Sequence, residues 1–134
     1  MKLIKTINLI PLNKEKTQIC LVKRTTDKNN KIKWAFPGES IKPDETNNQA
    51  MIRIIKDQMN CEAFNFKEFK KSETTTKLAV VKSQYLTGSI KGNIKLDQRK
   101  YTEYKWFDLN KNLLKLDYAF NEKMIVENLL KKNI

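Results

Sequence analysis

One stretch decides the fold of this chain: residues 34–61, with the sequence WAFPGESIKPDETNNQAMIRIIKDQMNC. Its first residues are expected to be extended, because Phe36 precedes a proline and is pushed out of helical geometry. Pro37-Gly38 then predicts a turn, and a loop with a second proline follows it. The remainder has the pattern of an amphipathic helix, and acidic residues lie along both the loop and the helix.

The helix is predicted over residues 47–59. Thr46 is a natural N-cap, and Gln49, three positions later, completes the pattern of a capping box. Asn60 is expected to end the helix as a C′ residue. Apolar side chains recur on one side at helical spacing, at Ala50, Met51, Ile54, Ile55 and Met59.

Strands are predicted on both sides of this stretch, from β-prone runs that end at turn residues. These runs cover residues 2–11, 17–24, 61–69, 76–86 and 102–108. The first two are expected to pair as a hairpin, and residues 25–33 to form a basic loop. Gly88 and Gly92 indicate loop positions. A closing helix is predicted over residues 120–132, with a buried stripe of Met124, Ile125, Leu129 and Leu130.

The element order is therefore β-β-β-α-β-β-β-α. Helices that are separated by strands have to pack on the faces of a sheet. This order predicts an α/β fold, a three-layer α/β/α sandwich around a mixed β-sheet. With 134 residues, 40% of them hydrophobic and 31% charged, the chain is expected to form a single domain over residues 1–134.

Several classes of protein are disfavoured by composition. No apolar run approaches the roughly 20 residues that span a bilayer. The N-terminal apolar patch is interrupted by Lys5 and Asn8 and has no small-residue cleavage site, which argues against a signal peptide. Two cysteines, Cys20 and Cys61, and no histidine make neither a disulfide framework nor a zinc site. A cytoplasmic protein is expected.

The net charge of +12 allows two interpretations. It favours phosphate-rich partners such as nucleotides or RNA, since basic charge attracts phosphate. It also fits a composition rich in Lys, Asn and Ile throughout the chain. Tyr85, Tyr101 and Tyr104 alternate with lysines between residues 67 and 105, which favours the first interpretation, but no RNA-binding motif is present.

The residues quoted above resemble the Nudix box, which is written G-x5-E-x7-R-E-U-x-E-E-x-G-U with U an apolar residue. With Glu45 as the first box glutamate, Arg53 takes the place of the box arginine. Ile55 and Cys61 take the two apolar positions. The strand at residues 21–24 and the late strand that contains Trp106 also agree with the family, so the resemblance to the Nudix hydrolase superfamily (MutT-like) covers nearly the whole chain.

The resemblance implies an enzyme that uses Mg²⁺ or Mn²⁺ to hydrolyse a nucleoside diphosphate linked to another group, a nucleoside triphosphate or a nucleotide derivative. Carried over by position, the catalytic candidates are Asp57, Glu45 and Gln58. The candidate substrate-binding residues are Lys23, Arg24, Glu39 and Glu103. Gly38 and Arg53 are the structural candidates, and Asp57 is the single candidate metal ligand.

The box is degenerate. Glu39 replaces its first glycine, Ile54 the glutamate after the arginine, Asp57-Gln58 the paired glutamates, and Asn60 the late glycine. Isoleucine has no lone pair for a cation and no group to accept a proton. Of the three carboxylates at box positions 54, 57 and 58, only Asp57 remains, which weakens a site that must bind Mg²⁺ and activate water.

A further acid of the family often lies about six residues before the late tryptophan. This chain has Lys100 there, a positive charge that would repel a metal ion. Asp97 and Glu103 are near but out of register. Catalysis is therefore predicted to be weak or lost, and the general base is unassigned.

Three functions stay open. The first is a Nudix hydrolase with a reduced metal site. The second is a non-catalytic module on the same fold that binds a nucleotide in its cleft, or RNA through its basic surface. The third is a domain that assembles with a partner chain; a homodimer is an expectation by analogy with the family.

Overall fold

The computed structural model describes residues 1–24 and 33–132. The basic loop predicted over residues 25–33 lies outside these ranges except for Lys33. The elements, in chain order, are β1 (Lys2–Pro11), β2 (Gln18–Arg24), β3 (Trp34–Ala35), β4 (Gly38–Ser40), α1 (Asn47–Met59), β5 (Glu62–Thr75), β6 (Ala79–Lys91), β7 (Tyr101–Asp108), the 3-10 helix η1 (Lys111–Lys115) and α2 (Glu122–Lys131).

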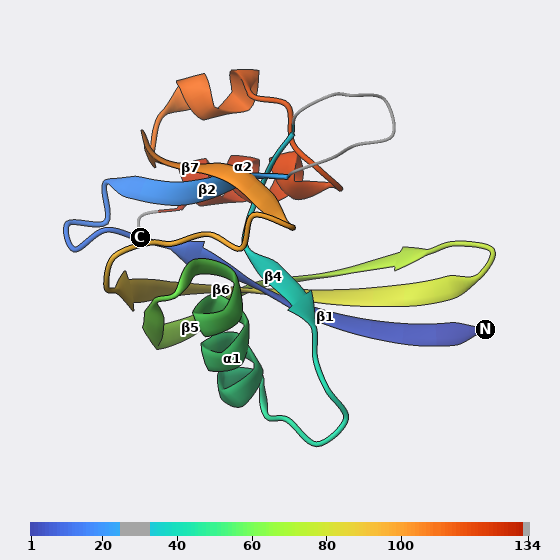
Figure 1. The fold of residues 1–134 in the computed structure, drawn as a ribbon. Helices are drawn as coiled ribbons and strands as arrows, with labels where there is room; N and C mark the ends of the chain where they lie inside the picture. Colours follow the sequence, from blue (N-terminus) through green and yellow to red (C-terminus); the bar gives the residue numbers. More distant parts are fainter. Residues whose placement is uncertain (25–32, 133–134) are drawn as a thin grey trace.

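The strands form two sheets (Figure 1). The larger has the order β4-β1-β6-β5, and β1 runs parallel to β6 from Lys2↔Ala79 to Pro11↔Gly88, so this sheet is mixed. The smaller has the order β3-β2-β7 and is antiparallel.

The predicted hairpin between the first two strands is wrong. β1 has β4 along one edge and β6 along the other, so neither edge is free for β2. In the described chain, β1 and β2 are linked at the turn between them, by an isolated bridge of Leu12 with Ile19 and by a hydrogen bond from the Asn13 N–H to the Gln18 carbonyl at 3.2 Å. The chain thus passes from one sheet to the other at the turn after β1, and non-local pairing with β6 overrides the local pattern.

The helices lie on opposite sides of the strands, with α1 against the larger sheet and α2 beside β2 and β7 (Figure 1). Each covers its own apolar cluster. Cys20 and Val22 of β2 pack in the cluster with α1, whereas Ile19 and Leu21 pack in the cluster with α2. β2 is therefore buried on both faces, and the predicted α/β/α sandwich is confirmed. No helix in residues 1–24 and 33–132 is long and apolar enough to cross a membrane.

The boundaries of α1 match the prediction. The Thr46 side chain accepts a hydrogen bond from the Gln49 N–H at 3.2 Å, and the Gln49 side chain accepts one from the Thr46 N–H at 3.0 Å. Asn60 ends the helix in the left-handed conformation, at φ 57°. All five predicted apolar residues of the helix are buried, and Gln58 joins them.

The buried stripe of α2 differs from the prediction. Met124 is 44% exposed, and Val126 takes its place in the core beside Ile125 and Leu129. Leu130 is partly buried against the same cluster. The reason is rotational: positions 125, 126 and 129 share one helical face with Glu122, which is buried as well.

β5 and β6 are longer than predicted. With the start of β1 they form an arm that projects from the body (Figure 1). β6 includes Gly88, which was predicted to be in a loop. A Cβ at Gly88 would lie 2.9 Å from Leu9 Cδ1 and 3.1 Å from the Phe64 carbonyl oxygen, so this glycine permits close packing within a strand. Gly92, with φ 119°, does lie beyond the strand.

Candidate active site

A cleft of about 440 Å³ lies over the larger sheet, between the loop that precedes α1 and the start of α2. Of the residues predicted from sequence, Arg24, Gly38 and Glu39 line it. Glu45, Lys23, Asp57, Gln58 and Glu103 are not among its lining residues. A larger groove of about 940 Å³ at the end of the sheet contains none of the predicted site residues.

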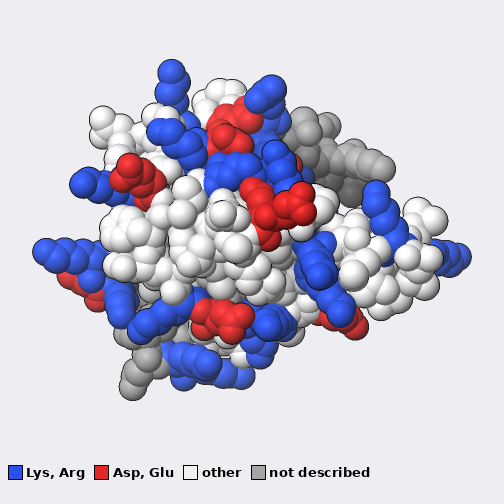
Figure 2. Space-filling model, turned by 90° about the horizontal axis from the view of Figure 1, so that it is seen from below, with Lys and Arg blue, Asp and Glu red and all other residues white. Residues whose placement is uncertain are grey.

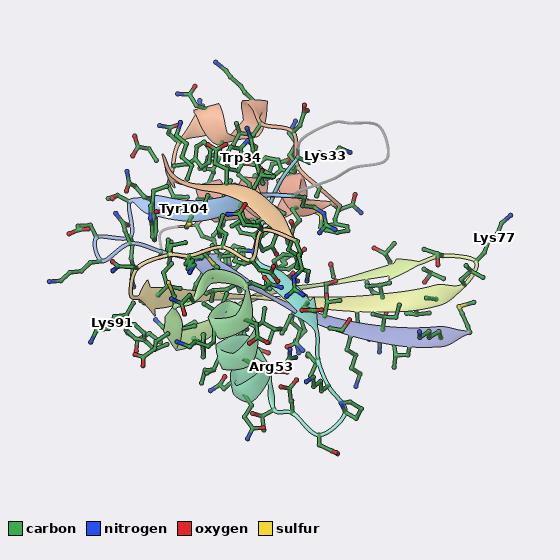
Figure 3. All side chains as sticks on the ribbon, in the orientation of Figure 1. Lys33, Trp34, Arg53, Lys77, Lys91 and Tyr104 are labelled. Carbon is green, nitrogen blue, oxygen red and sulfur yellow. The ribbon has the colours of Figure 1, made fainter. Side chains whose placement is uncertain are left out.

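Glu45 and Arg53 fix the loop that leads into α1. The Arg53 guanidinium donates to Glu45 Oε2 at 2.6 Å and to Oε1 at 2.8 Å, from the position on α1 labelled in Figure 3. The Lys42 N–H donates to Glu45 Oε1 as well, at 2.9 Å, and Arg53 also donates to the Ser40 carbonyl at 3.2 Å. Chiefly because of the Arg53 hydrogen bonds, the pKa of Glu45 is lowered to about 2. Both carboxylate oxygens are therefore committed to holding the loop.

Gln58 is buried behind the cleft, and both ends of its amide are occupied. Its Nε2 donates to the Gly38 carbonyl at 2.9 Å, and its Oε1 accepts from the Tyr101 hydroxyl at 2.9 Å. Burial raises the pKa of Tyr101, so this hydroxyl keeps its proton. Gly38 has to be a glycine, since a Cβ there would lie 2.6 Å from the Ile7 carbonyl oxygen. Gln58 thus ties the box loop to α1 and β7.

These residues do not fit a divalent metal ion. Ile54 is 0% exposed and packs in the apolar cluster, while Asp57 lies exposed on the outer face of α1. In the part of the chain that the structure describes, no three acidic or cysteine side chains converge as a ligand set. Mg²⁺ prefers several oxygen ligands, including carboxylates, around one point, so no catalytic step can be assigned to a metal held by these side chains.

Two ion pairs involve the predicted substrate-binding residues. Lys100 Nζ lies 3.3 Å from Glu39 Oε2, and both residues line the cleft. Lys23 Nζ lies 3.5 Å from Glu103 Oε2 and 5.0 Å from the centre of the Trp34 ring. Lys23 and Glu103 therefore pair with each other across β2 and β7, outside the cleft lining.

Glu122 was missed in the sequence and lies in the cleft wall. It is 1% exposed, accepts from the Phe36 N–H at 3.1 Å and accepts from the Tyr85 hydroxyl at 2.9 Å. Burial raises its pKa to about 7. Positions 122, 125, 126 and 129 share one face of α2, so the helical period could have predicted that this acid is buried. The predicted stripe included Met124 and Leu130 instead, and therefore left Glu122 out.

A row of hydroxyl side chains crosses the cleft floor and was also missed. Thr6 on β1 is opposite both Ser40 on β4 and Ser83 on β6, and Ser83 is opposite Ser72 on β5. All four line the cleft, and the Thr6 hydroxyl donates to Ser83 Oγ at 2.8 Å. The row depends on the pairing of four strands, so no local sequence signal could have revealed it. It gives the cleft a floor of hydrogen-bonding groups for a polar ligand.

In this α/β/α sandwich, the loop before α1 is held in shape by Glu45, Arg53 and Gln58 beside the cleft. The NUDIX domain profile matches residues 2–128, and the chain belongs to the Nudix family. A comparison of the sequence with curated proteins found no match.

Solved structures share the fold. The Escherichia coli ORF135 protein superposes with a TM-score of 0.84 at 17% identity, over 98% of this chain and 91% of that one. A MutT from a study of the Aliivibrio salmonicida and Vibrio cholerae proteins gives 0.81 at 16% identity, over 97% and 98%. The MutT protein of Methanosarcina mazei Go1 gives 0.76 at 18%, over 97% and 94%.

Proposed function

We propose that this Nudix-family chain binds a nucleotide or nucleotide derivative in the cleft, and that its metal-dependent pyrophosphohydrolase activity is weak or lost. The family and the MutT neighbours support the nucleotide. The loss of activity is supported by one observation above all: both polar atoms of the Gln58 amide are already bonded within the protein. Gln58 is also uncharged and only 2% exposed, so it is a poor replacement for a carboxylate ligand of a divalent cation.

The remaining acids support the same proposal. Glu45 is committed to Arg53, and Asp57 is exposed on α1 beside the positive charge of Arg53. Among the residues that the structure describes, no group of acids is adequate to hold a cation that would neutralise phosphate charge and lower the pKa of water. Mg²⁺ or Mn²⁺ remains the cofactor of any residual activity, with Asp57 as its single candidate ligand.

The test is a panel of nucleoside triphosphates, dinucleotides and nucleotide sugars with Mg²⁺ or Mn²⁺, followed by release of phosphate and pyrophosphate. We expect little or no turnover. Turnover at about 1 s⁻¹ or faster, an ordinary enzyme rate, that disappears in Asp57→Asn would contradict the proposal. Glu127→Gln, which changes an exposed acid on α2 outside the cleft lining, is the matched control.

A second candidate ligand is RNA, and the larger groove is the observation that favours it. Four lysines line this groove with four aromatic residues: Lys14, Lys16, Lys67 and Lys132 with Phe64, Phe66, Phe69 and Trp106. Its one acidic lining residue, Glu68, already pairs with Lys71 at 3.6 Å. Lysines beside partly exposed aromatic rings are the combination that binds single strands, because bases stack on the rings while the ammonium groups meet the phosphates. On the face seen in Figure 2, by contrast, Lys and Arg are spread out with Asp and Glu among them.

The groove is tested with a labelled single-stranded RNA titrated at increasing salt. Changing Lys14, Lys16 and Lys67 together to Gln should weaken binding and flatten its salt dependence. The matched control removes the same charge at Lys2, Lys77 and Lys111; Lys77 is at the far tip of the arm (Figure 3). Equal loss in both variants, or no binding at low salt, would exclude the groove as an RNA site.

The remaining proposals are coarser. We place residues 1–134 in one Nudix domain, and a homodimer stays a proposal by analogy with the family. Cys20 and Cys61 are free and buried, which is compatible with the reducing cytoplasm expected from the sequence.

A further inference from the structure

The cleft lacks a metal site but holds a cation of its own. Lys100 occupies the position where the family often has a further acid, and its ammonium lies in the cleft with about a third of the side chain exposed. Charge-assisted hydrogen bonds from Lys and Arg are among the strongest contacts that a protein makes to nucleotide phosphates. In this cleft the charged donors among the described lining residues are Lys100 and Arg24.

Lys100 is held in place by the backbone around it. The Lys100 and Tyr101 N–H groups both donate to the Asp97 carbonyl, at 2.9 and 3.0 Å. The Asp97 N–H donates to the Gln58 carbonyl at 2.9 Å, which ties this turn to the end of α1. The backbone at Lys100 is therefore fixed at the end of α1, the helix that carries the metal ligands in the family's enzymes.

The charges that face this ammonium are few. Glu39 pairs with it at 3.3 Å and is about half exposed, so a phosphate has to compete with this carboxylate. The Asp97 carboxylate also interacts with Lys100, but it is paired with Arg99 at 3.1 Å. Glu122 is the other acid in the cleft lining, and its two oxygens accept from Phe36 and Tyr85. Arg24 pairs in register with Tyr101, the residue after Lys100, and its guanidinium lies 5.1 Å from the centre of the Phe120 ring as a second positive group.

We propose that the Lys100 ammonium, paired with Glu39, takes the place of a divalent cation in this cleft, so that a nucleoside diphosphate binds through direct contact with Lys100 and without Mg²⁺. Arg24 supplies a second contact to the phosphates. This proposal rests on the proposed function of the cleft. It also makes sense of two substitutions together, since a lysine in place of an acid and a glutamate in place of a glycine form one ion pair.

Removing the charge of Glu39 should change nucleotide affinity in opposite directions, depending on whether Lys100 or a metal ion binds the phosphates. If Lys100 binds the phosphates, Glu39 is a competitor, and Glu39→Gln should tighten binding. If a metal ion binds them, Glu39 is one of the few carboxylates near it, and Glu39→Gln should weaken binding. The direction of this one change separates the two arrangements.

The experiment is calorimetric titration of ADP, once with EDTA and once with Mg²⁺. We expect equal affinity in both, an affinity about tenfold lower in Lys100→Gln, and a higher affinity in Glu39→Gln. Lys95→Gln is the matched control, because Lys95 is an exposed lysine of the same segment outside the cleft lining. Thermal melting confirms that each variant is folded.

Each other outcome is decisive. ADP binding that requires Mg²⁺, or that weakens in Glu39→Gln, overturns the role of Lys100 and leaves nucleotide binding by the cleft intact. An equal change of ADP affinity in Lys95→Gln and Lys100→Gln overturns it too, because the change would then come from the lower net charge of the protein and not from a contact of Lys100. No ADP binding in either buffer overturns the proposed function and this inference together.

Discussion

Glu122 couples the stability of this protein to pH. Burial raises its pKa from 4.5 to about 7, so the folded protein holds this proton where the unfolded chain has released it. The stability that the protonated Glu122 carboxyl contributes is fully present below pH 4.5. It is lost as the pH rises from there to about 7. The full difference is about 3 kcal/mol.

Glu122→Gln should therefore remove this loss. Unfolding by urea at several pH values between 4.5 and 7.5 would compare the slopes of the two proteins. We expect the stability of the wild type to fall with pH relative to that of the variant. Parallel profiles would show that the folded carboxyl is already ionised throughout this range.

Ile54 shows at the same scale why the lost metal ligand is not easily restored. Its side chain is 0% exposed in the apolar cluster under α1. Ile54→Glu would bury a carboxylate without a partner, and we expect it to cost more than about 3 kcal/mol of stability or to prevent folding.

Ile52→Glu is the control for that change, because Ile52 is on the same helix and 49% exposed. It should change the free energy of unfolding by about 0.5 kcal/mol or less. Urea unfolding of both variants is the measurement. A stable, folded Ile54→Glu protein would mean that the cluster opens at this position more readily than its packing indicates.

Among the elements, α1 carries its own start signal, and this explains why the sequence predicts it so well. The reciprocal hydrogen bonds of Thr46 and Gln49 are local, three residues apart. Thr46→Ala should lower the free energy of unfolding by about 1 kcal/mol, whereas Thr46→Ser, which retains the hydroxyl, should change it little. Thermal melting of the two variants measures this, and equal losses would assign the effect to the methyl group instead of the cap.

What the sequence could not predict is non-local. The caps of α1 and the extent of β7 follow from neighbouring residues, and the positions of Glu45 and Arg53 from the spacing of one motif. The partner of β1 is β6, more than 70 positions away in register, so the local pattern favoured a hairpin that does not form. The hydroxyl row needs that same pairing before it exists, and the Lys100–Glu39 pair joins β4 to the turn before β7, which are also far apart in the sequence. Glu122 lies between these two cases. Its burial could be predicted from the helical period of α2, but its partners Phe36 and Tyr85 are far away in the sequence.

Across the whole molecule, burial is unevenly distributed. The body carries both apolar clusters, whereas the arm formed by β1, β5 and β6 is mostly exposed or half-buried over its outer half. Leu3 is 53% exposed and Leu78, near its tip, is 82% exposed. The arm is thus held mainly by its backbone ladders and gains little from apolar contact.

Hydrogen exchange should resolve this difference, because segments with few buried contacts open at a lower free energy than the global one. We expect the amides of residues 2–5 and 72–82 to exchange well before those of residues 84–90, although the same strands carry both groups. Exchange followed by mass spectrometry, with short peptides from each half, makes the comparison within one molecule and needs no variant. Equal protection along β6 would mean that arm and body unfold as one cooperative unit. Since Ser72 and Ser83 sit where the arm meets the cleft, adding a ligand that uses the hydroxyl row should slow exchange there and leave the tip unchanged.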